Sequence, residues 1–370
     1  MRPDRFELER YFSRHEFSAR FLLASSDCES LPMAELLSWA DDECRELWQS
    51  LRLGYTESPG LPLLRREIAA LYEGIVADEV LEIVPEEGIF LTMNALLEPG
   101  DHVISTWPGY QSLYSLAETI GCDVTYWRPD EAQGWRFDPA AVRDALRPAT
   151  RLIVVNFPHN PTGYLPPRED FEEVLAIARD AGVPVFSDEM YRWLEQDPGE
   201  RLPSAVERYD RAVSLCGLSK TFALPGLRVG WLATRDADVL SRVAALKDFT
   251  TICGSAPGEV LALVALRNAA RLIARSLALT SSNLDRLDEF FATRTEVFSW
   301  VRPRAGSIGL ARLHRPEGAH EFCRRLVEEA GVLLAPSTVF GFGDEHVRFG
   351  FGRANLPEAV AALDAWLRPR

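Results

Sequence analysis

Several residues whose side chains could do chemistry stand directly after apolar runs in this 370-residue sequence. Lys220 follows AVSLCGLS, Asp188 follows VPVFS, and Asn160 follows RLIVVNFPH. Each has an ordinary structural explanation: a lysine is usually solvated, an aspartate after a strand is often a helix N-cap, and Asn-Pro-Thr-Gly forms turns. An amine, an acid and an amide at successive strand ends are a rarer combination. It favours a binding site, because α/β proteins bind ligands at the carboxyl ends of parallel strands.

The elements that would position these side chains alternate between strands and helices through the middle of the chain. The run RLIVVN is apolar almost throughout, as expected of a strand covered on both faces. Amphipathic segments separate such runs, as expected of helices. The expected strands are 101–106, 122–127, 151–156, 183–186 and 212–215, and the expected helices are 111–120, 138–146 and 169–181. This order predicts an α/β fold: a mainly parallel sheet with helices on both faces.

The pattern changes after about residue 284. A long helical stretch at 283–297 leads to short strands at 307–313 and 346–350 and to a closing helix at 357–367. These elements predict a smaller α+β domain, completed by the N-terminal residues. We therefore expect a large domain over 46–284 and a small domain formed by 1–45 and 285–370.

Composition excludes several classes of protein. The formal net charge of −15 argues against nucleic-acid binding, which needs basic surface. No apolar run is long enough to cross a membrane, and the mixed-charge start lacks the apolar core of a signal peptide. The six cysteines show no pairing pattern and the histidines no zinc-ligand spacing, so we expect free thiols and no metal site. Together these features predict a cytoplasmic protein.

Two long blocks carry a resemblance to a known family. SLCGLSKTFALPGLRVGW (214–231) and NFPHNPTG (156–163) resemble the fold-type I, aspartate-aminotransferase-like enzymes of class I/II, which use pyridoxal 5′-phosphate (PLP). The similarity runs from Tyr55 to Arg348 in the family's order and spacing. Parts of both blocks also occur in a divergent branch that includes capreomycidine synthase. The resemblance implies the PLP-transferase fold, with the cofactor bound by the large domain.

The resemblance also implies roles around the cofactor ring. Lys220 matches the lysine that forms a Schiff base with PLP and, once released, moves the Cα proton of the substrate. Asp188 matches the carboxylate that keeps the pyridine nitrogen protonated. Tyr191 and Asn160 match the pair that hydrogen-bonds the phenolic oxygen, with Asn160 also beside the substrate. Trp107 matches the aromatic residue that stacks on the ring.

Further matches concern the phosphate, the substrate and a second subunit. Ser219 and Arg228 match phosphate ligands, and a guanidinium suits a phosphate dianion. Arg348 matches the arginine that grips the substrate α-carboxylate. Tyr55 matches a tyrosine that reaches the phosphate of a neighbouring subunit, which implies a homodimer with shared active sites.

The sequence departs from the family pattern at three places. Relatives carry Gly-Ala-x-Glu where this chain has Val-Pro-Glu-Glu at 84–87. The amides of Glu86 and Glu87 could still bind phosphate if the Glu86 side chain points away. Gly217 replaces a common Ser or Thr, which removes a hydroxyl from the phosphate site. The stretch 24–30, with Ser26, replaces a Gly-x-Pro segment; because it is small and polar, it predicts a polar substrate.

Three functions follow from these observations. The leading expectation is an aminotransferase acting between an α-amino acid and a 2-oxo acid. The second is a PLP-dependent lyase or cyclase, similar to capreomycidine synthase, which would share the first proton transfer by Lys220. The third is a non-catalytic ligand-binding module, as in regulators built on this fold. The chain before Tyr55 is too short and too acidic for the DNA-binding domain that such a regulator needs.

Overall fold

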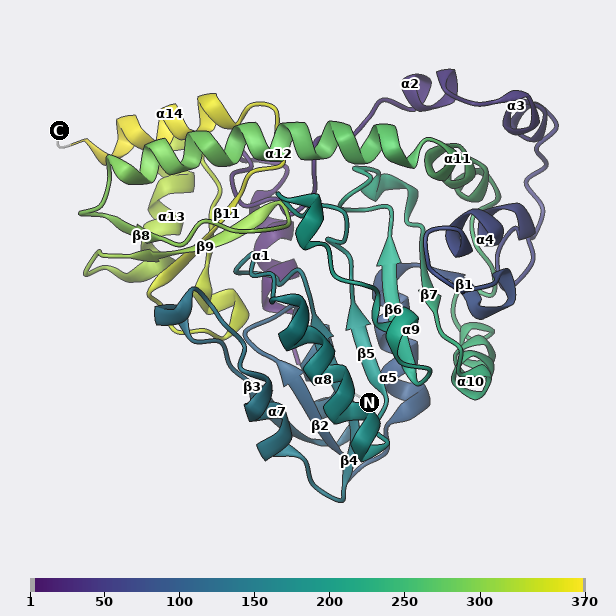
Figure 1. Cartoon of the computed structure of the whole chain (residues 1–370). Helices are drawn as coiled ribbons and strands as arrows, with labels where there is room; N and C mark the ends of the chain where they lie inside the picture. Colours follow the sequence, from purple (N-terminus) through teal and green to yellow (C-terminus); the bar gives the residue numbers. More distant parts are fainter. Residues whose placement is uncertain (1–3, 369–370) are drawn as a thin grey trace.

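The computed structural model describes residues 4–368 and contains a large, mainly parallel sheet (Figure 1). Its strand order is β1-β7-β6-β5-β4-β2-β3, in which β3, β2, β4, β5 and β6 pair in parallel and β7 is antiparallel to both neighbours. The strands are β1 (Val80–Ile83), β2 (His102–Thr106), β3 (Asp123–Trp127), β4 (Thr150–Asn156), β5 (Val185–Asp188), β6 (Ala212–Gly217) and β7 (Gly230–Ala233). The predicted fold class is confirmed.

Helices cover both faces of this sheet, and β4 shows why its sequence is apolar throughout. Ile153 and Val155 pack with helices α7 and α8, whereas Leu152 and Val154 pack with α5, α6 and α10. Successive residues of a strand point to opposite faces, so a strand covered on both sides needs apolar residues at every position. The helices named here are α5 (Pro85–Leu96), α6 (Ser112–Ile120), α7 (Pro139–Ala145), α8 (Arg168–Ala181) and α10 (Ala237–Lys247).

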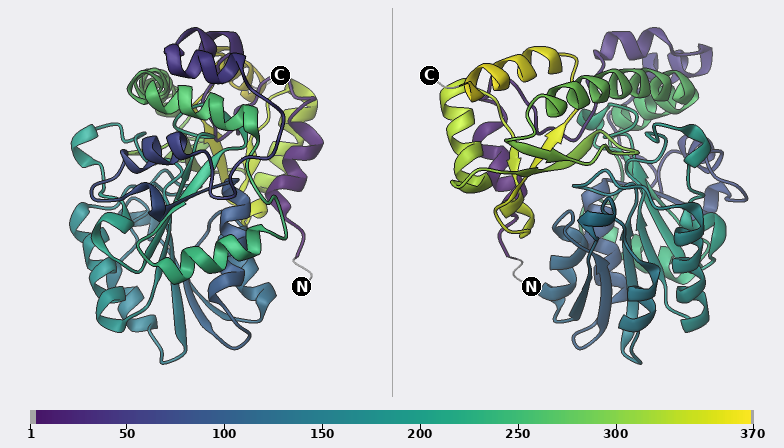
Figure 2. Two further views of the ribbon diagram at one scale, coloured as in Figure 1. Left: turned by 90° about the vertical axis from the view of Figure 1, so that its right-hand side faces the viewer. Right: turned by 60° about the vertical axis from the view of Figure 1, so that its left-hand side comes forward.

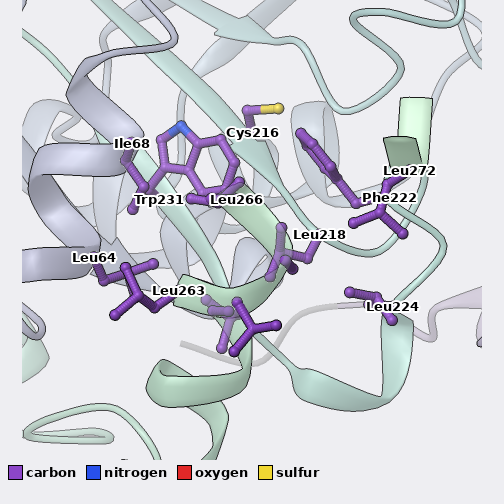
Figure 3. Packing of buried hydrophobic residues seen from close by; sticks show 14 of the residues in the cluster. Leu64, Ile68, Cys216, Leu218, Phe222, Leu224, Trp231, Leu263, Leu266 and Leu272 are labelled. Carbon is purple, nitrogen blue, oxygen red and sulfur yellow. The ribbon is translucent and has the colours of Figure 1, made fainter. Parts of the chain in front are cut away.

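The part of the sheet formed by β6 and β7, next to the edge strand β1, packs against a further group of helices (Figure 3). Trp231 and Cys216 from these strands meet Ile68 of α4 and Leu266 of α11. The indole Nε1 of Trp231 donates a hydrogen bond to the hydroxyl of Tyr72 over 2.7 Å, so the only polar atom of this side chain has a partner. The helices around this edge are α2 (Met33–Ser38), α3 (Asp42–Gln49), α4 (Pro62–Ala69), α9 (Ala205–Arg208) and α11 (Ala256–Arg267).

A second, antiparallel sheet has the strand order β10-β11-β9-β8. The N-terminal segment belongs with it: Phe21 pairs with Val332, and Leu8 of α1 packs with Leu333. Figure 2 shows α1 beside this unit. Its elements are β8 (Phe298–Trp300), β9 (Ile308–Leu313), β10 (Ala335–Pro336), β11 (His346–Gly350), α1 (Glu7–His15), α12 (Ala269–Ala292), α13 (Gly318–Ala330) and α14 (Leu356–Leu367).

The predicted strands of the large sheet are all present, and the main differences concern its edge and the long helix. β1 and β7 were not expected; they pair antiparallel and lie outside the alternation of strands and helices that marked the parallel strands. The helix expected at 283–297 overlaps the last part of α12, which begins at Ala269 and ends at Ala292. The domain boundary remains a prediction, and Leu36 and Ala40 of the N-terminal stretch pack with the large sheet. Within residues 4–368, no helix combines the length and the apolar character needed to span a membrane.

Candidate active site

A cavity of about 590 Å³ opens at the carboxyl edge of the large sheet. Its floor comes from the ends of β4 and β5 and from the loop after β6, and the start of α5 forms one side. The N-terminal helix α1 and the segment 25–27, here called the strap, form another side. The topology therefore brings to one place the strand ends that the sequence singled out.

Lys220 lies in this cavity, and its Nζ donates a hydrogen bond to Ser26 Oγ over 2.8 Å. Desolvation lowers the pKa of the Lys220 amine below its usual value, and the nearby Arg348 guanidinium lowers it further, although Asp27 opposes the shift. A lower pKa increases the fraction of neutral amine, which is the form that attacks a carbonyl and accepts a proton.

Asp188 ends β5 directly opposite Asn156, the last residue of β4. Its Oδ1 accepts a hydrogen bond from the backbone N–H of Met190 over 3.1 Å. Burial raises the pKa of Asp188 to about 7, against the lowering effects of that N–H and of Lys220. A buried carboxyl with a raised pKa favours a cationic partner, because a nearby positive charge would stabilise its ionised form.

Arg348 and Asn160 are held together in the cavity wall. Nη1 of Arg348 donates to Asn160 Oδ1 over 3.0 Å, and Nη2 donates to the carbonyl of Ala24 over 2.8 Å. Arg348 is only 1% exposed, and within residues 4–368 its Nε has no hydrogen-bond partner. The Tyr191 hydroxyl is buried beside them, close to Ser26. Because buried polar atoms are rarely left unpaired, the Arg348 Nε indicates a ligand.

Ser219 and Arg228 also line the cavity, near the start of α5. Pro85 is the first residue of α5, so the amides of Glu86 and Glu87 fall in the first turn, where N–H groups lack helical acceptors. The Glu86 side chain also lines the cavity, so the condition that it points away from the site is not met. Burial raises the pKa of Glu86 to about 7, and the Glu9 carboxylate contributes, although a hydrogen bond from Ser112 (3.1 Å) opposes the shift.

The side chain of Glu87 turns to a different part of the surface. It accepts a hydrogen bond from Thr251 Oγ1 over 2.9 Å, and Thr250 also bonds to it. The Glu87 carboxylate does not line the cavity. Only its backbone amide therefore remains a candidate phosphate ligand.

Trp107 does not lie where the prediction placed it. Its ring stacks on Tyr126 at a centroid distance of 5.3 Å, and the Arg128 guanidinium lies 4.0 Å from its centroid. These contacts occupy the indole, and Trp107 does not line the cavity, whereas Tyr110 does. These positions argue against the ring-stacking role predicted for Trp107, and Tyr110 is the aromatic residue of this motif that lines the cavity. The sequence located the motif Trp107-Pro-Gly-Tyr110 at the site, but it did not show which of the two aromatic rings lines the cavity.

Tyr55 is 90% exposed and does not line the cavity of its own chain. The neighbouring Thr56 fixes this segment through bonds to Glu259 (2.8 Å) and to the carbonyl of Gly254 (3.4 Å). Tyr55 can therefore bind phosphate only from a second subunit, which is the role that was predicted for it.

Ser26 sits on a strap that several contacts hold in place. Ser307 Oγ donates to the Ser26 carbonyl over 2.7 Å, and Gly350 packs so closely that a Cβ there would lie 2.0 Å from the Ser25 carbonyl oxygen. The strap also brings Asp27 into the cavity, and Glu16, the residue that follows α1, lines it too. The sequence reasoning missed both acids. No local motif marks them, since they reach the site only when the N-terminal segment packs on the second sheet.

The cavity residues fit pyridoxal phosphate. The Lys220 amine matches its aldehyde, the buried Asp188 matches its ring nitrogen, and the buried Tyr191 hydroxyl matches its phenolic oxygen. Arg228, Ser219 and the first turn of α5 offer cationic and N–H donors for its phosphate.

The fold and this cavity define a protein that binds a small molecule beside a partly desolvated lysine. Residues 21–363 match the family "Aminotransferase class I and II". Capreomycidine synthase of Streptomyces vinaceus is 32% identical over 96% of this chain and 92% of its own length. A probable N-succinyldiaminopimelate aminotransferase of Mycobacterium tuberculosis is 31% identical over 77% of this chain and 74% of its own.

Two solved structures resemble the whole chain. A PLP-dependent aminotransferase from Streptococcus suis has a TM-score of 0.93 and 31% identity, covering 100% of this chain and 98% of its own. The PLP-dependent cyclase OrfR has a TM-score of 0.90 and 30% identity, with the same coverage. The chain belongs to the aminotransferase class I and II family. The predictions of the family, of a PLP-dependent transferase and of the cofactor are confirmed.

Proposed function

We propose that the protein transfers an amino group from an α-amino acid to a 2-oxo acid, with PLP held on Lys220. The observation that carries this proposal is the convergence of Lys220, Asp188, Tyr191 and Arg348 on one cavity. These side chains come from loops and strands far apart in the sequence. Each offers the group that one part of the reaction needs: an amine, an acid, a hydroxyl and a carboxylate receptor.

Bound PLP supplies an aldehyde that takes up the amine and a ring that withdraws electrons from the substrate Cα. The chain's own residues supply the rest. Arg348 orients the substrate through its α-carboxylate, and Asp188 provides the negative charge that holds a proton on the ring nitrogen. Lys220 Nζ, made less basic by its surroundings, would take the proton from the substrate Cα and return it to the former aldehyde carbon of the cofactor, two atoms from Cα. Ser26 fixes Nζ on the strap side.

The test follows a single half-reaction in the absence of an acceptor. Mixing purified holoenzyme with an amino donor should change the visible absorbance of the cofactor and release one equivalent of 2-oxo acid, with no free ammonia. Lys220→Ala should lose the absorbance of lysine-bound cofactor and slow the reaction by about 10²–10⁴-fold, the usual contribution of a general acid–base group. A Lys220→Ala protein that keeps this absorbance would refute the assignment.

A PLP-dependent lyase or cyclase is the second candidate, favoured by one observation. Capreomycidine synthase matches 96% of the chain, and a PLP-dependent cyclase matches its fold over the full length. Such an enzyme would use the same proton transfer but would then expel or replace a β-substituent. Catalytic release of ammonia, or of a cyclised product, without any 2-oxo acid acceptor would favour this candidate over transamination.

The protein acts as a homodimer in this proposal, and the exposed surface supports it. Leu53, Tyr55 and Phe249 are large apolar or aromatic side chains exposed by 86%, 90% and 88%. Their segments meet where Thr56 bonds to the carbonyl of Gly254. A second subunit would bury this patch and bring its Tyr55 to the phosphate. Light scattering should give twice the 41.5 kDa chain mass.

The proposal also includes a cytoplasmic location and the predicted division into a large domain (46–284) and a small one (1–45 and 285–370). All six cysteines are free, which suits a reducing compartment.

A further inference from the structure

One wall of the cavity contains three acidic side chains that have no role in the proposed cofactor chemistry. Glu9 and Glu16 come from one face of the N-terminal helical segment, seven residues apart, and Phe12 lies between them on the same face. Asp27 reaches the cavity from the strap. None of the roles assigned to the lysine, the phosphate ligands or the carboxylate receptor involves these three acids.

The partners of these acids differ in a way that singles out Glu16. Asp27 is paired with Arg353, whose Nη2 lies 2.9 and 3.0 Å from its two oxygens. Glu9 accepts a hydrogen bond from the Tyr110 hydroxyl over 3.1 Å. Within residues 4–368, no hydrogen bond or ion pair reaches the Glu16 side chain. Burial and the Asp27 and Glu9 carboxylates raise the pKa of Glu16, although the Arg353 and Lys220 cations oppose the shift. Arg353 is already paired with Asp27, so in the described part of the chain no cation forms an ion pair with the Glu16 carboxylate.

A second observation on the same wall points to a ligand. The Ser25 side chain lines the cavity, is only 3% exposed, and has no hydrogen-bond partner for its hydroxyl in the described part of the chain. A buried hydroxyl left without a hydrogen bond destabilises the protein, so a bound group that completes this bond is favoured. The wall thus presents a hydroxyl together with carboxylate oxygens, and a ligand group rich in N–H donors would satisfy both.

We propose that the substrate is an α-amino acid whose side chain ends in a guanidinium or an ammonium group, bound by Glu16 with Ser25 and Asp27. This inference rests on the proposed function, because it leaves Arg348 for the α-carboxylate and Lys220 for the α-amine. The wall disfavours a second substrate carboxylate. Among the residues that line the cavity, the remaining cation is Arg10, which is exposed and adjacent to Glu9 in the chain.

The test compares amino donors of similar length with the holoenzyme. Ornithine carries a cationic end, norvaline a neutral one and glutamate an anionic one. The value of kcat/KM for ornithine should exceed the other two at least ten-fold. In the Glu16→Gln variant the ratio of ornithine to norvaline should fall at least ten-fold. Glu7→Gln, on the same helix but outside the cavity, should keep the wild-type ratio.

Equal kcat/KM values, a preference for glutamate, or a preference for ornithine that survives Glu16→Gln would each overturn the inference. Calorimetric binding of the same amino acids to Lys220→Ala protein separates it from the proposed function. If no donor reacts but ornithine still binds at least ten-fold more tightly than norvaline, the reaction is wrong and the ligand class stands. If the donors react but the affinity is the same for ornithine, norvaline and glutamate, the proposed ligand class is wrong.

Discussion

The ring of Pro85 packs against Gly217, where an added Cβ would lie 3.0 Å from Pro85 Cγ and 3.0 Å from the Cα of Gly230. Both Pro85 and Gly217 are departures from the family pattern, and the structure shows that they form one packing unit. The proline at the start of α5 fills the space that the side chain of a serine or threonine at 217 would need. With Pro85 in this place, a residue larger than glycine at 217 would be crowded.

This contact predicts that the two positions are energetically coupled. Gly217→Ser alone should lower the free energy of unfolding and weaken cofactor binding, because the new side chain crowds Pro85. Adding Pro85→Ala should recover part of both losses, with a coupling energy of about 0.5–3 kcal/mol. Denaturant titrations and PLP titrations of the two single variants and the double variant measure it. Purely additive effects would show that the positions are independent.

Ser26 is expected to position the Lys220 amine rather than to bind the cofactor. Ser26→Ala removes the acceptor 2.8 Å from Nζ and should lower kcat by about 10-fold or more, within the range for a misplaced general base. The Kd for PLP should change much less. Ser26→Thr keeps the hydroxyl and should restore part of kcat. Equal losses in kcat and in PLP affinity would indicate a purely structural role.

Tyr110, not Trp107, should contribute to cofactor affinity through its ring. Tyr110→Ala should weaken PLP binding by about 0.5–1.5 kcal/mol, the usual value of an aromatic contact. Tyr110→Phe should retain most of that affinity, because the stacking surface remains. Trp107→Phe serves as the matched control, since the indole already packs on Tyr126 outside the cavity. A larger loss of affinity from Trp107→Phe than from Tyr110→Ala would instead support the ring-stacking role predicted for Trp107.

Glu86 should make the cofactor-free protein less stable as the pH rises. Its folded pKa of about 7 exceeds the ordinary value of 4.5, so the folded chain holds the proton more tightly than the unfolded chain. Because folding is linked to proton binding, the free energy of unfolding should decrease between about pH 4.5 and 7 and stay low above that range. Asp188 acts in the same direction, so the measurement is the difference between variants.

Melting temperatures of wild type and Glu86→Gln, measured without cofactor at pH 5 and pH 8, isolate this effect. The decrease in melting temperature from pH 5 to pH 8 should be smaller in Glu86→Gln than in the wild type. Glu87→Gln, in the same helical turn but outside the cavity, should keep the wild-type drop. An ionised Glu86 also repels phosphate, so PLP affinity at pH 8 should rise in Glu86→Gln. Identical pH dependence in wild type and Glu86→Gln would contradict the buried position of this acid.

The sequence predicted the parts of the site that lie in continuous blocks. Lys220, Asp188 and Asn160 each follow a buried strand, and an apolar run of that length marks a strand without any knowledge of its neighbours. Because parallel strands end at one edge of a sheet, the chain order alone placed these residues together. The same local patterns gave the fold class and the strands β2 to β6.

Tertiary packing decided which side chains complete the cavity. Glu16, Asp27 and Ser26 belong to an N-terminal segment held by Ser307, by β11 and by the loop that follows β11, roughly three hundred residues later in the chain. Whether Tyr110 or Trp107 faces the ligand depended on how Tyr126 covers the indole. Local sequence patterns determine the strand ends and the chemistry that follows them, because their signal lies within a few residues. Contacts between distant segments leave no such local signal, so only the folded structure showed the acidic wall and the link between Pro85 and Gly217.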